Sequence, residues 1–439
     1  MNTKTKSAKL KKSFLPDTLV LHGGYKPEQH GRCAAVPIYQ TTSFVFDNAQ
    51  YGADLFDLAI AGNIYSRLSN PTLDVLEQRI AALEGGVGAL AVASGMAAID
   101  YAIATISSAG DHIIATSELY GGTHNFFSHI LPSRGISSTL VNKNDFTALK
   151  AAIKDNTRAI FIESIGNPSG GMVDIKKIAE IAHEAGIVVI VDNTVASPIL
   201  IRPIEHGADI VVHSATKYIG GHGTVLGGLI IDAGRFDWGL HQARYPQFTL
   251  PDPSYHGIIF SDHFGNQAYI ARARTVPLRN TGAALSANSA FLLLQGLETL
   301  AIRMERISNN TTRIVDYLAV HPLVEKVHHV SIKTHPDHEL SKQYISENST
   351  PGIISFELKG GRDTARIFYD ALKLFLRLVN IGDSKSLAAI PAETTHHQLD
   401  DAALAKVGIT PGLVRLSIGI EHVNDLLDDL DQALEEASS

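Results

Sequence analysis

The stretch IVVIVD, residues 187–192, is a run of five apolar residues that ends on an aspartate. Continuous apolar runs of this length are typical of strands that are buried on both faces of a sheet. The chain contains six more short apolar runs, which are ALAVAS (89–94), HIIATS (112–117), SSTLVN (137–142), AIFIES (159–164), DIVVHS (209–214) and GGLIID (227–232). We therefore predict one large sheet built from these runs.

Helical patterns lie between several of these runs. Between Asn70 and Gly85 the apolar residues follow helical spacing, with Asn70 placed to cap the helix and Gly85 to end it. A second helical pattern covers residues 174–185 and stops at Gly186. Strands that alternate with helices predict an α/β fold, in which helices cover a largely parallel sheet.

The two ends of the chain have different patterns. The first 60 or so residues are rich in turns, and we expect an extended N-terminal arm over residues 1–62. At about residue 290 a long helical pattern begins, SAFLLLQGLETLAIRMERI, and fewer strand patterns follow it. We predict a large domain over residues 63–298 and a smaller C-terminal α/β domain over residues 299–439.

Composition narrows the class of protein. Of 439 residues, 45% are hydrophobic and 19% are charged, which is typical of a folded globular chain. The net charge of −8, with no basic stripe, argues against nucleic-acid binding. The single cysteine, Cys33, rules out a disulfide within the chain. With no apolar run long enough to span a membrane, we expect a cytoplasmic protein with a solvated, lysine-rich tail over residues 1–12.

Polar residues follow four of the predicted strands. In open α/β sheets, ligands bind beyond the carboxyl ends of the strands, so these residues are the first candidates for a site. They are Ser94-Gly95-Met96, Glu163 to Asn167, Asp192-Asn193 and Ser214 to Lys217.

Three of these strand ends carry distinctive chemistry. Asp192 ends the most apolar run, where a partly desolvated carboxylate either caps the next loop or faces a cationic partner. Lys217 lies in SATKYIGGHG, and a desolvated lysine is nucleophilic toward carbonyls. Ser94 and Gly95 open a predicted helix whose free N–H groups suit an anion, although Ser94 could also be only a helix cap.

One cofactor would use all of these groups. Pyridoxal 5′-phosphate (PLP) requires a lysine for a Schiff base, an acid for its ring nitrogen and a cradle for its phosphate. We expect the glycines after the lysine to let the chain fold back without crowding the cofactor ring. The residues that fit these needs are Lys217, Asp192, Gly95, Met96, Ser214 and Thr216.

The motifs YSRLSNPT, ASGMAAI, YGGT, VDNTVASP and SATKYIGGHG occur in this order along the chain. With these motifs in this order, nearly the whole chain resembles the Cys/Met-metabolism PLP enzymes, which have the fold of the type I PLP-dependent transferases. The resemblance implies that residues 63–298 bind PLP, that Lys217 forms the Schiff base and that Asp192 contacts the ring nitrogen. Tyr120 would stack on the ring and assist proton transfer. The same resemblance assigns cofactor contacts to Gly95, Met96, Asn167, Ser214 and Thr216.

The resemblance also implies partners and substrate contacts. In this family the tyrosine and arginine of the YSR motif, here Tyr65 and Arg67, reach the phosphate bound by a neighbouring subunit. This implies a homodimer at least, and usually a homotetramer. Arg415 matches the arginine that pairs with the substrate α-carboxylate, although read alone it would be an ordinary ion-pair residue. Asn380 and Tyr65 are the other expected substrate contacts.

Three details favour one branch of the family. The segment QFTLPDPSYHG (247–257) resembles an extra segment of O-acetylhomoserine sulfhydrylases, as do Asn380 and Lys385. Methionine γ-lyases carry a cysteine where this chain has Gly122. The implied reaction is γ-replacement on O-acetyl-L-homoserine by sulfide or methanethiol, a step of methionine biosynthesis.

Other functions stay open at this point. A carbon–sulfur lyase acting on methionine or cystathionine, or an O-succinylhomoserine sulfhydrylase, would use the same cofactor. A nucleotide-binding or dehydrogenase module is disfavoured, because no G-x-G-x-x-G follows a strand and no P-loop occurs. We expect no metal, because HPDHE (335–339) and TTHHQ (394–398) lack a recognised ligand spacing.

Overall fold

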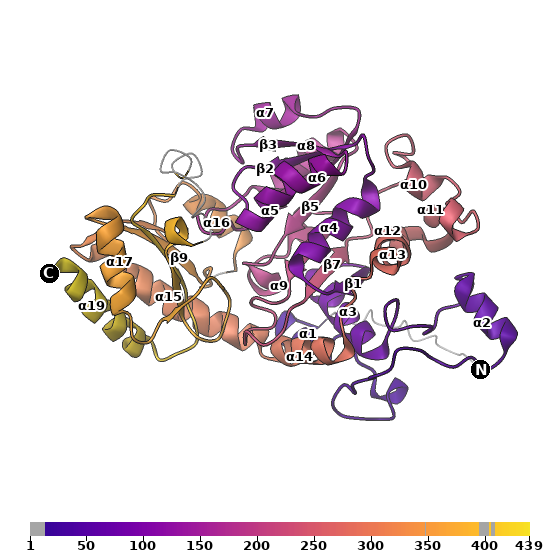
Figure 1. Ribbon diagram of the computed structural model, residues 1–439, viewed down its shortest axis with the longest axis horizontal. Helices are drawn as coiled ribbons and strands as arrows, with labels where there is room; N and C mark the ends of the chain where they lie inside the picture. The colour runs from indigo at the N-terminus through magenta and orange to yellow at the C-terminus, as the bar shows by residue number, and fades with distance from the viewer. Residues whose placement is uncertain (1–13, 347, 395–403, 405–408) are drawn as a thin grey trace, which may run out of the picture.

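The seven apolar runs form the seven strands of one sheet in the computed structural model, which describes residues 14–346, 348–394, 404 and 409–439. The strand order is β1-β7-β6-β5-β4-β2-β3, and β7 alone runs opposite to the other six strands. The predicted α/β fold with a largely parallel sheet is confirmed (Figure 1). The strands are β1 Gly88–Val92, β2 His112–Thr116, β3 Ser137–Val141, β4 Thr157–Glu163, β5 Val188–Asp192, β6 Ile210–Ser214 and β7 Gly228–Asp232.

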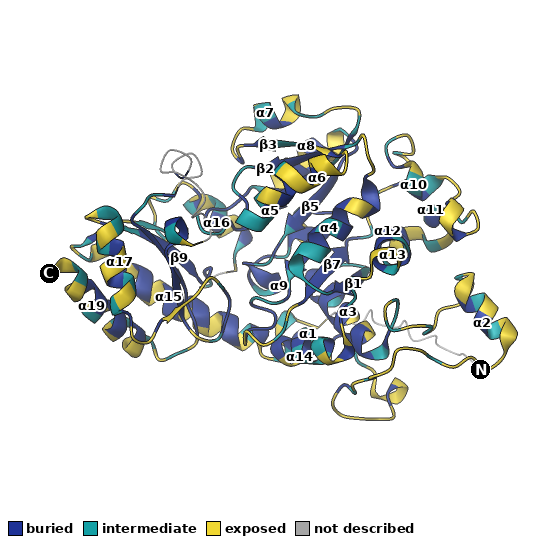
Figure 2. Cartoon of the chain, viewed as in Figure 1, coloured by how far each residue is buried: buried dark blue, intermediate teal, exposed yellow. Residues whose placement is uncertain are grey.

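Both faces of this sheet are buried, which explains why its strands are apolar without alternation. In β5, Val189 and Val191 pack in one core cluster, whereas Val188 and Ile190 pack in the other. Figure 2 shows the central strands as buried elements between helices with exposed outer faces. The covering helices include α3 Pro71–Glu84, α4 Gly95–Ile106, α8 Ile175–Glu184, α12 Ala268–Ala273 and α14 Ala287–Glu298.

The predicted helix ends are confirmed. The side chain of Asn70 caps α3 by accepting a hydrogen bond of 2.9 Å from the Thr72 N–H. Gly85 ends α3 in the left-handed region, with φ of 82°. Asp174 caps α8 by accepting a bond of 3.0 Å from the Lys177 N–H.

The long helical pattern after residue 290 is divided into two helices. α14 ends at Glu298 and α15, Leu300–Val320, begins two residues later. The break leaves the Gly296 carbonyl to accept hydrogen bonds from the Thr299 N–H and the Arg303 side chain. The predicted domain boundary between residues 298 and 299 stays a prediction, because the first half of α15 packs in the same core cluster as the large sheet.

A second sheet occupies the C-terminal part of the chain, on the left of Figure 1. Its strand order is β10-β11-β12-β9-β8, and it has its own buried core with α15, α17 (Gly361–Ala371) and α19 (Val423–Ser438). No described helix is both long and apolar enough to cross a membrane. The strands are β8 Val324–His328, β9 Ile353–Leu358, β10 Leu376–Arg377, β11 Leu387–Ala389 and β12 Leu413–Ser417.

The N-terminal arm leaves much of its apolar surface exposed. It contains two short helices, α1 Pro16–His22 and α2 Ala49–Phe56, and α2 projects away from both sheets (Figure 1). Val45 is 95% exposed and Phe56 is 50% exposed. The predicted tail over residues 1–12 lies outside the described residues.

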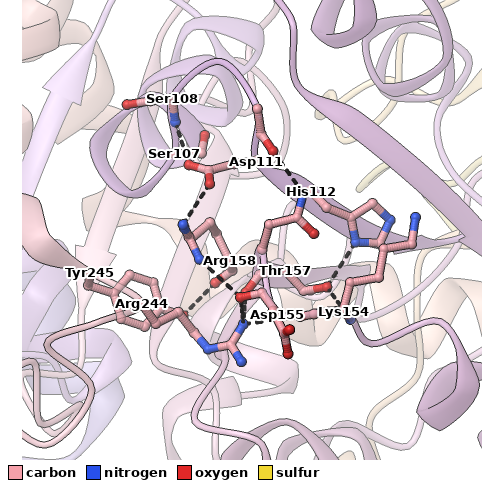
Figure 3. Close-up of polar contacts among 12 residues, drawn as sticks. Ser107, Ser108, Asp111, His112, Lys154, Asp155, Thr157, Arg158, Arg244 and Tyr245 are labelled. Atoms are coloured by element: carbon pink, nitrogen blue, oxygen red, sulfur yellow. Dashed lines mark hydrogen bonds and ion pairs between the residues drawn. The ribbon is translucent and has the colours of Figure 1, made fainter.

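The segment 247–257 follows two residues, Arg244 and Tyr245, that bind the amino end of β4 (Figure 3). The Arg244 guanidinium donates to the carbonyl of Thr157, the first residue of β4. The Tyr245 hydroxyl donates to the carbonyl of Arg158 at 2.6 Å. The segment therefore starts at the edge of the sheet opposite to the carboxyl ends of the parallel strands.

Candidate active site

The carboxyl ends of β4, β5 and β6 open onto one cavity, which the C-terminal domain closes on one side. Nine of the twelve predicted site residues line it. They are Gly95, Met96, Tyr120, Asn167, Asp192, Ser214, Thr216, Lys217 and Arg415.

Lys217 reaches into this cavity from the turn that follows β6. Its Nζ donates a hydrogen bond of 2.5 Å to the Asn380 Oδ1, which comes from the C-terminal domain. Burial, followed by the positive charge of Arg415, lowers the pKa of Lys217 below its ordinary value. A larger fraction of the amine is therefore neutral near pH 7, which is the form that attacks a carbonyl.

The glycines after Lys217 face protein side chains. Gly221 has a φ of +69°, and a Cβ added there would collide with the Arg303 guanidinium. A Cβ added at Gly223, with φ of +66°, would lie 2.6 Å from the Asp383 Oδ2. These two glycines therefore make room for Arg303 and Asp383 as the chain turns back.

Asp192 forms another part of the cavity wall, at the end of β5. Its Oδ1 accepts a hydrogen bond of 2.9 Å from the Thr194 N–H, so it does cap the loop that follows. Burial raises the pKa of Asp192, while its bonds to Thr194 lower it. A cationic group placed against this carboxylate would stabilise its charged form.

Glu163 is a second buried carboxylate that the sequence did not single out for a role. It ends β4 and lies beside Asp192 in the sheet register. Its Oε1 accepts a hydrogen bond of 2.7 Å from the Tyr120 N–H, and this bond holds the start of the Tyr120 loop. Burial and the negative charge of Asp192 raise the pKa of Glu163 well above its ordinary value.

The start of α4 is the candidate phosphate cradle, and it lines the same cavity. Ser94 caps the helix, with its Oγ accepting a hydrogen bond of 3.2 Å from the Ala97 N–H. A Cβ added at Gly95 would lie 2.6 Å from the Ser214 Cβ, so glycine allows the helix end to approach β6. Backbone N–H groups and hydroxyls thus converge where a phosphate would be stabilised.

Arg415 extends from β12 and is almost fully buried. Its Nη1 donates to the Asn167 Oδ1 at 3.1 Å, and its Nη2 donates to the Asn380 carbonyl at 2.9 Å. Its Nε is buried without a hydrogen-bond partner. Burial lowers the pKa of Arg415 to about 10, so it stays charged at neutral pH and can bind a carboxylate.

Three predicted residues do not line the cavity: Asn380, which bonds to Lys217, and two residues that lie elsewhere, Tyr65 and Arg67. Tyr65 and Arg67 line a separate hollow together with residues 39–42 and 284–287. Tyr65 is 42% exposed, and the Arg67 guanidinium lies 5.4 Å from its ring centroid.

The residues that favoured one branch of the family take different positions. Asn380 bonds to Lys217, as described above. Lys385 is largely exposed, and its Nζ lies 2.8 Å from the Asp383 Oδ1. Neither Lys385 nor any residue of the segment 247–257 lines the cavity.

The histidine-rich motifs show no metal-binding geometry where they are described. Among the residues that the structure describes, no three His, Cys, Asp or Glu side chains are grouped to hold a metal ion. In HPDHE, Asp337 instead binds Lys143 at 2.9 Å. His396 and His397 lie outside the described residues.

The donors in this cavity fit PLP. A lysine of lowered pKa, a buried carboxylate and a helix start with hydroxyls correspond to the aldehyde, the ring nitrogen and the phosphate of this cofactor. Only glycine fits at position 95, where the helix start approaches Ser214. The buried Arg415 Nε has no hydrogen-bond partner and is therefore available to a bound ligand. Fold and site together define an enzyme of the PLP-dependent class.

Comparison with known proteins gives the family. The sequence model described as "Cys/Met metabolism PLP-dependent enzyme" matches residues 17–435, and the chain belongs to this family. The homocysteine synthase of Schizosaccharomyces pombe is 48% identical over 422 residues, covering 96% of this chain and 98% of the relative. The O-acetyl-L-homoserine sulfhydrylase of Leptospira meyeri is 47% identical over 431 residues, covering 96% of this chain and 97% of the relative.

A solved structure agrees with these relatives. The putative O-acetylhomoserine (thiol)-lyase of Campylobacter jejuni has a TM-score of 0.91 and 44% identity, and the match covers 96% of this chain and all of that chain. That protein was solved with N'-pyridoxyl-lysine-5'-monophosphate.

Proposed function

We propose that this protein is a PLP-dependent transferase that carries out γ-replacement on O-acetyl-L-homoserine. The C–O bond at the γ-carbon breaks and releases acetate, and a C–S bond to sulfide forms L-homocysteine. Methanethiol in place of sulfide gives L-methionine. The observation that carries the proposal is that Asn380 binds two site residues at once. Its side chain accepts a hydrogen bond from the Lys217 amine, and its carbonyl accepts one from Arg415, which would bind the substrate carboxylate.

Arg415 and Asn380 bind and orient the amino-acid substrate in this proposal. The Arg415 Nε is buried and unpartnered, so a substrate carboxylate would supply its missing acceptor. The Asn167 amide supports the same guanidinium at 3.1 Å. A buried charge-assisted pair of this kind fixes the α-carbon relative to Lys217.

Lys217 moves protons in this proposal. When bound, PLP acts as an electron sink that makes the substrate α-proton removable. The Lys217 Nζ takes that proton as a general base and later returns it as a general acid. Burial and the Arg415 charge lower the pKa of Lys217, which leaves more of the amine free to accept a proton, and its bond to Asn380 orients the amine.

The remaining site residues hold the cofactor. Asp192 would keep the ring nitrogen protonated, and Tyr120 would stack on the ring and assist proton transfer. Glu163 supports this position of Tyr120 through its 2.7 Å bond to the Tyr120 N–H. The phosphate would bind at the start of α4, with contacts from Gly95, Met96, Ser214 and Thr216 and a further cofactor contact from Asn167.

We also propose that the active enzyme is a cytoplasmic homo-oligomer, a tetramer, with each site shared between two subunits. Tyr65 and Arg67 are exposed and lie outside the cavity of their own chain, as residues that serve a neighbouring site would. The exposed apolar side chains of the arm, such as Val45 and Phe56, suit burial against a second copy. The single cysteine, Cys33, is free and exposed, which fits a reducing compartment.

Steady-state kinetics tests the proposed function. The PLP-loaded protein should be assayed with O-acetyl- and O-succinyl-homoserine, each against sulfide and methanethiol. We expect the highest kcat/KM for the acetyl ester with sulfide, and the Lys217→Ala variant should lose this activity by at least about a thousandfold. Full activity in Lys217→Ala would contradict the proposed role of Lys217, and a preference for the succinyl ester would contradict the substrate.

A further inference from the structure

The long helix α15 presents one buried arginine to the turn that carries Lys217. Arg303 is only 4% exposed. Its Nη1 donates to the Tyr218 carbonyl at 2.7 Å, and its Nη2 donates to the Ile219 carbonyl at 3.2 Å. These are the carbonyls of the two residues directly after Lys217.

The rest of the guanidinium binds the preceding helix end. Nη2 also donates to the Gly296 carbonyl at 2.8 Å, and Nε donates to the Thr299 Oγ1 at 3.1 Å. Burial lowers the pKa of Arg303 to about 10, while the charge of Asp383 raises it, so the side chain is a cation at neutral pH. The planar fork of arginine spans these acceptors in a way that a single ammonium cannot.

The glycine-rich sequence after Lys217 is matched to this arginine. Gly221 takes a left-handed φ of +69°, and any side chain there would collide with the Arg303 guanidinium. The Gly221 N–H also donates to the Lys217 carbonyl at 2.8 Å. The turn is therefore stabilised by two kinds of contact. One is the hydrogen bond from the Gly221 N–H to the Lys217 carbonyl, and the other is the set of hydrogen bonds from Arg303.

The same helix reaches the strand that carries Arg415. Asn310 follows Arg303 by two helical turns and lies on the same helix face. Its Nδ2 donates to the carbonyls of Gly419 and Glu421 at 3.0 Å each, in the loop just after β12. α15 thus contacts both the Lys217 turn and the end of the Arg415 strand.

We infer that Arg303 is a positioning residue for the reaction, which sets the orientation of the Lys217 amine by holding the carbonyls behind it. Through Asn310 on the same helix, it also fixes that turn relative to the strand of Arg415. The inference rests on the proposed role of Lys217 but not on the identity of the substrate.

The first test compares two buried arginines. In Arg303→Met, the pH midpoint of the visible absorption of the PLP-loaded protein should shift by about one unit. With O-acetylhomoserine and sulfide, kcat should fall about tenfold while KM stays within about twofold. Arg79→Met is the control, because Arg79 is also buried and donates to a backbone carbonyl, that of Gly23 at 3.0 Å. This control should lower the unfolding temperature without moving the absorption midpoint.

The second test perturbs the contact between Gly221 and the Arg303 guanidinium without removing the arginine. It tests the inference even if Arg303→Met does not fold. Gly221→Ala places a methyl group against the guanidinium, whereas Gly282→Ala adds the same group at a similar φ of +79° with nothing within 4 Å. Gly221→Ala should shift the absorption midpoint, and Gly282→Ala should not. A wild-type midpoint in Gly221→Ala, or in a folded Arg303→Met, would overturn the inference. Failure of the wild-type enzyme to make homocysteine would contradict only the proposed function, because the absorption measurement needs no substrate.

Discussion

Lys217 derives its chemistry from groups that lie far from it in the sequence. The Asn380 amide orients its amine, burial and then the Arg415 charge lower its pKa, and Arg303 holds the turn behind it. The same lysine on an exposed surface would be a charged group with an ordinary pKa. The site is therefore built at the residue scale by contacts between segments that belong to the two sheets and to α15.

A charge placed at position 380 tests this control of the lysine. In Asn380→Asp, a carboxylate would lie against the Lys217 Nζ, which now contacts Asn380 at 2.5 Å. An opposite charge favours the ammonium form and raises the pKa of Lys217, so the rise of kcat with pH should move upward by about one unit or more. Asn380→Ser is the uncharged control, and its profile should keep the wild-type position at a lower kcat. An unmoved profile in Asn380→Asp would show that Lys217 is not the group that titrates.

Gly122 tests the space beside Tyr120. A Cβ added at Gly122 would lie 2.7 Å from the Tyr120 Cε1, so any side chain there displaces the ring. We expect Gly122→Cys to lower kcat/KM for homocysteine synthesis about tenfold, because overpacking of this kind costs about 1–3 kcal/mol. Gly122→Ala makes the same first contact and should show most of the loss. Wild-type kinetics in the alanine variant would contradict the steric explanation.

At the element scale, one buried histidine, His112, joins three neighbouring strands, and Figure 3 shows it beside Thr157. His112 starts β2, and its ring nitrogens lie 2.9 Å from the Thr157 Oγ1 of β4 and 2.8 Å from the Thr139 Oγ1 of β3. Burial, with a smaller effect of Lys154, lowers the pKa of His112 to about 4. The folded protein therefore holds this histidine neutral at a pH where the unfolded chain would charge it.

This difference predicts a pH-dependent stability. The contribution is complete above the unfolded pKa of 6.5 and is lost as the pH falls toward 4, because the unfolded state binds the proton more readily. Its upper limit is about 3 kcal/mol. In His112→Gln, the free energy of unfolding should depend less on pH between pH 4 and 6.5 than in the wild type, as measured by denaturant titration at several pH values. Equal slopes for the two proteins would contradict the assignment.

The sequence predicts elements better than it predicts contacts between them. The seven strands were predictable, because a strand buried on both faces must be apolar throughout, as residues 187–191 are. Asp192 and Lys217 were predictable as site residues because parallel strands end at the same edge of a sheet. The break at Thr299 was not, because the apolar spacing continues through it.

Glu163 and Arg303 show why the rest of the site could not be predicted. Each is a buried ionisable side chain whose partners come from segments that are distant in the sequence, Tyr120 for Glu163 and Tyr218 for Arg303. A sequence pattern marks the charge but does not show the carbonyl or N–H that satisfies it. In the sequence the segment 247–257 favours one branch of the family, yet it does not line the cavity of its own chain.

At the scale of the whole molecule, we propose that the arm of one chain serves the cavity of a second copy. Tyr65 and Arg67 are exposed in a hollow of their own, and α2 of the arm projects away from both sheets (Figure 2). The proposal that each site is shared between two copies of the chain explains both observations. It also explains why apolar residues such as Val45 are exposed in one chain.

Mixing two inactive variants tests the shared site. Lys217→Ala and Arg67→Ala would each inactivate every site in its own oligomer. In a mixed dimer, one site carries both substitutions and the other carries neither, so remixing by mild denaturation and refolding should restore about a quarter of wild-type activity. Refolding each variant alone is the control and should restore none. An inactive mixture would mean that Arg67 serves the site of its own chain.

The fate of O-acetyl-L-homoserine tests the central claim most directly. The purified, PLP-loaded protein should be incubated with this substrate, with and without sulfide, and the products measured by mass spectrometry. We predict that homocysteine and acetate form in equal amounts when sulfide is present, and that little 2-oxobutanoate forms without it. Rapid release of 2-oxobutanoate and ammonia in the absence of sulfide, with no homocysteine in its presence, would identify a lyase and contradict the proposed γ-replacement.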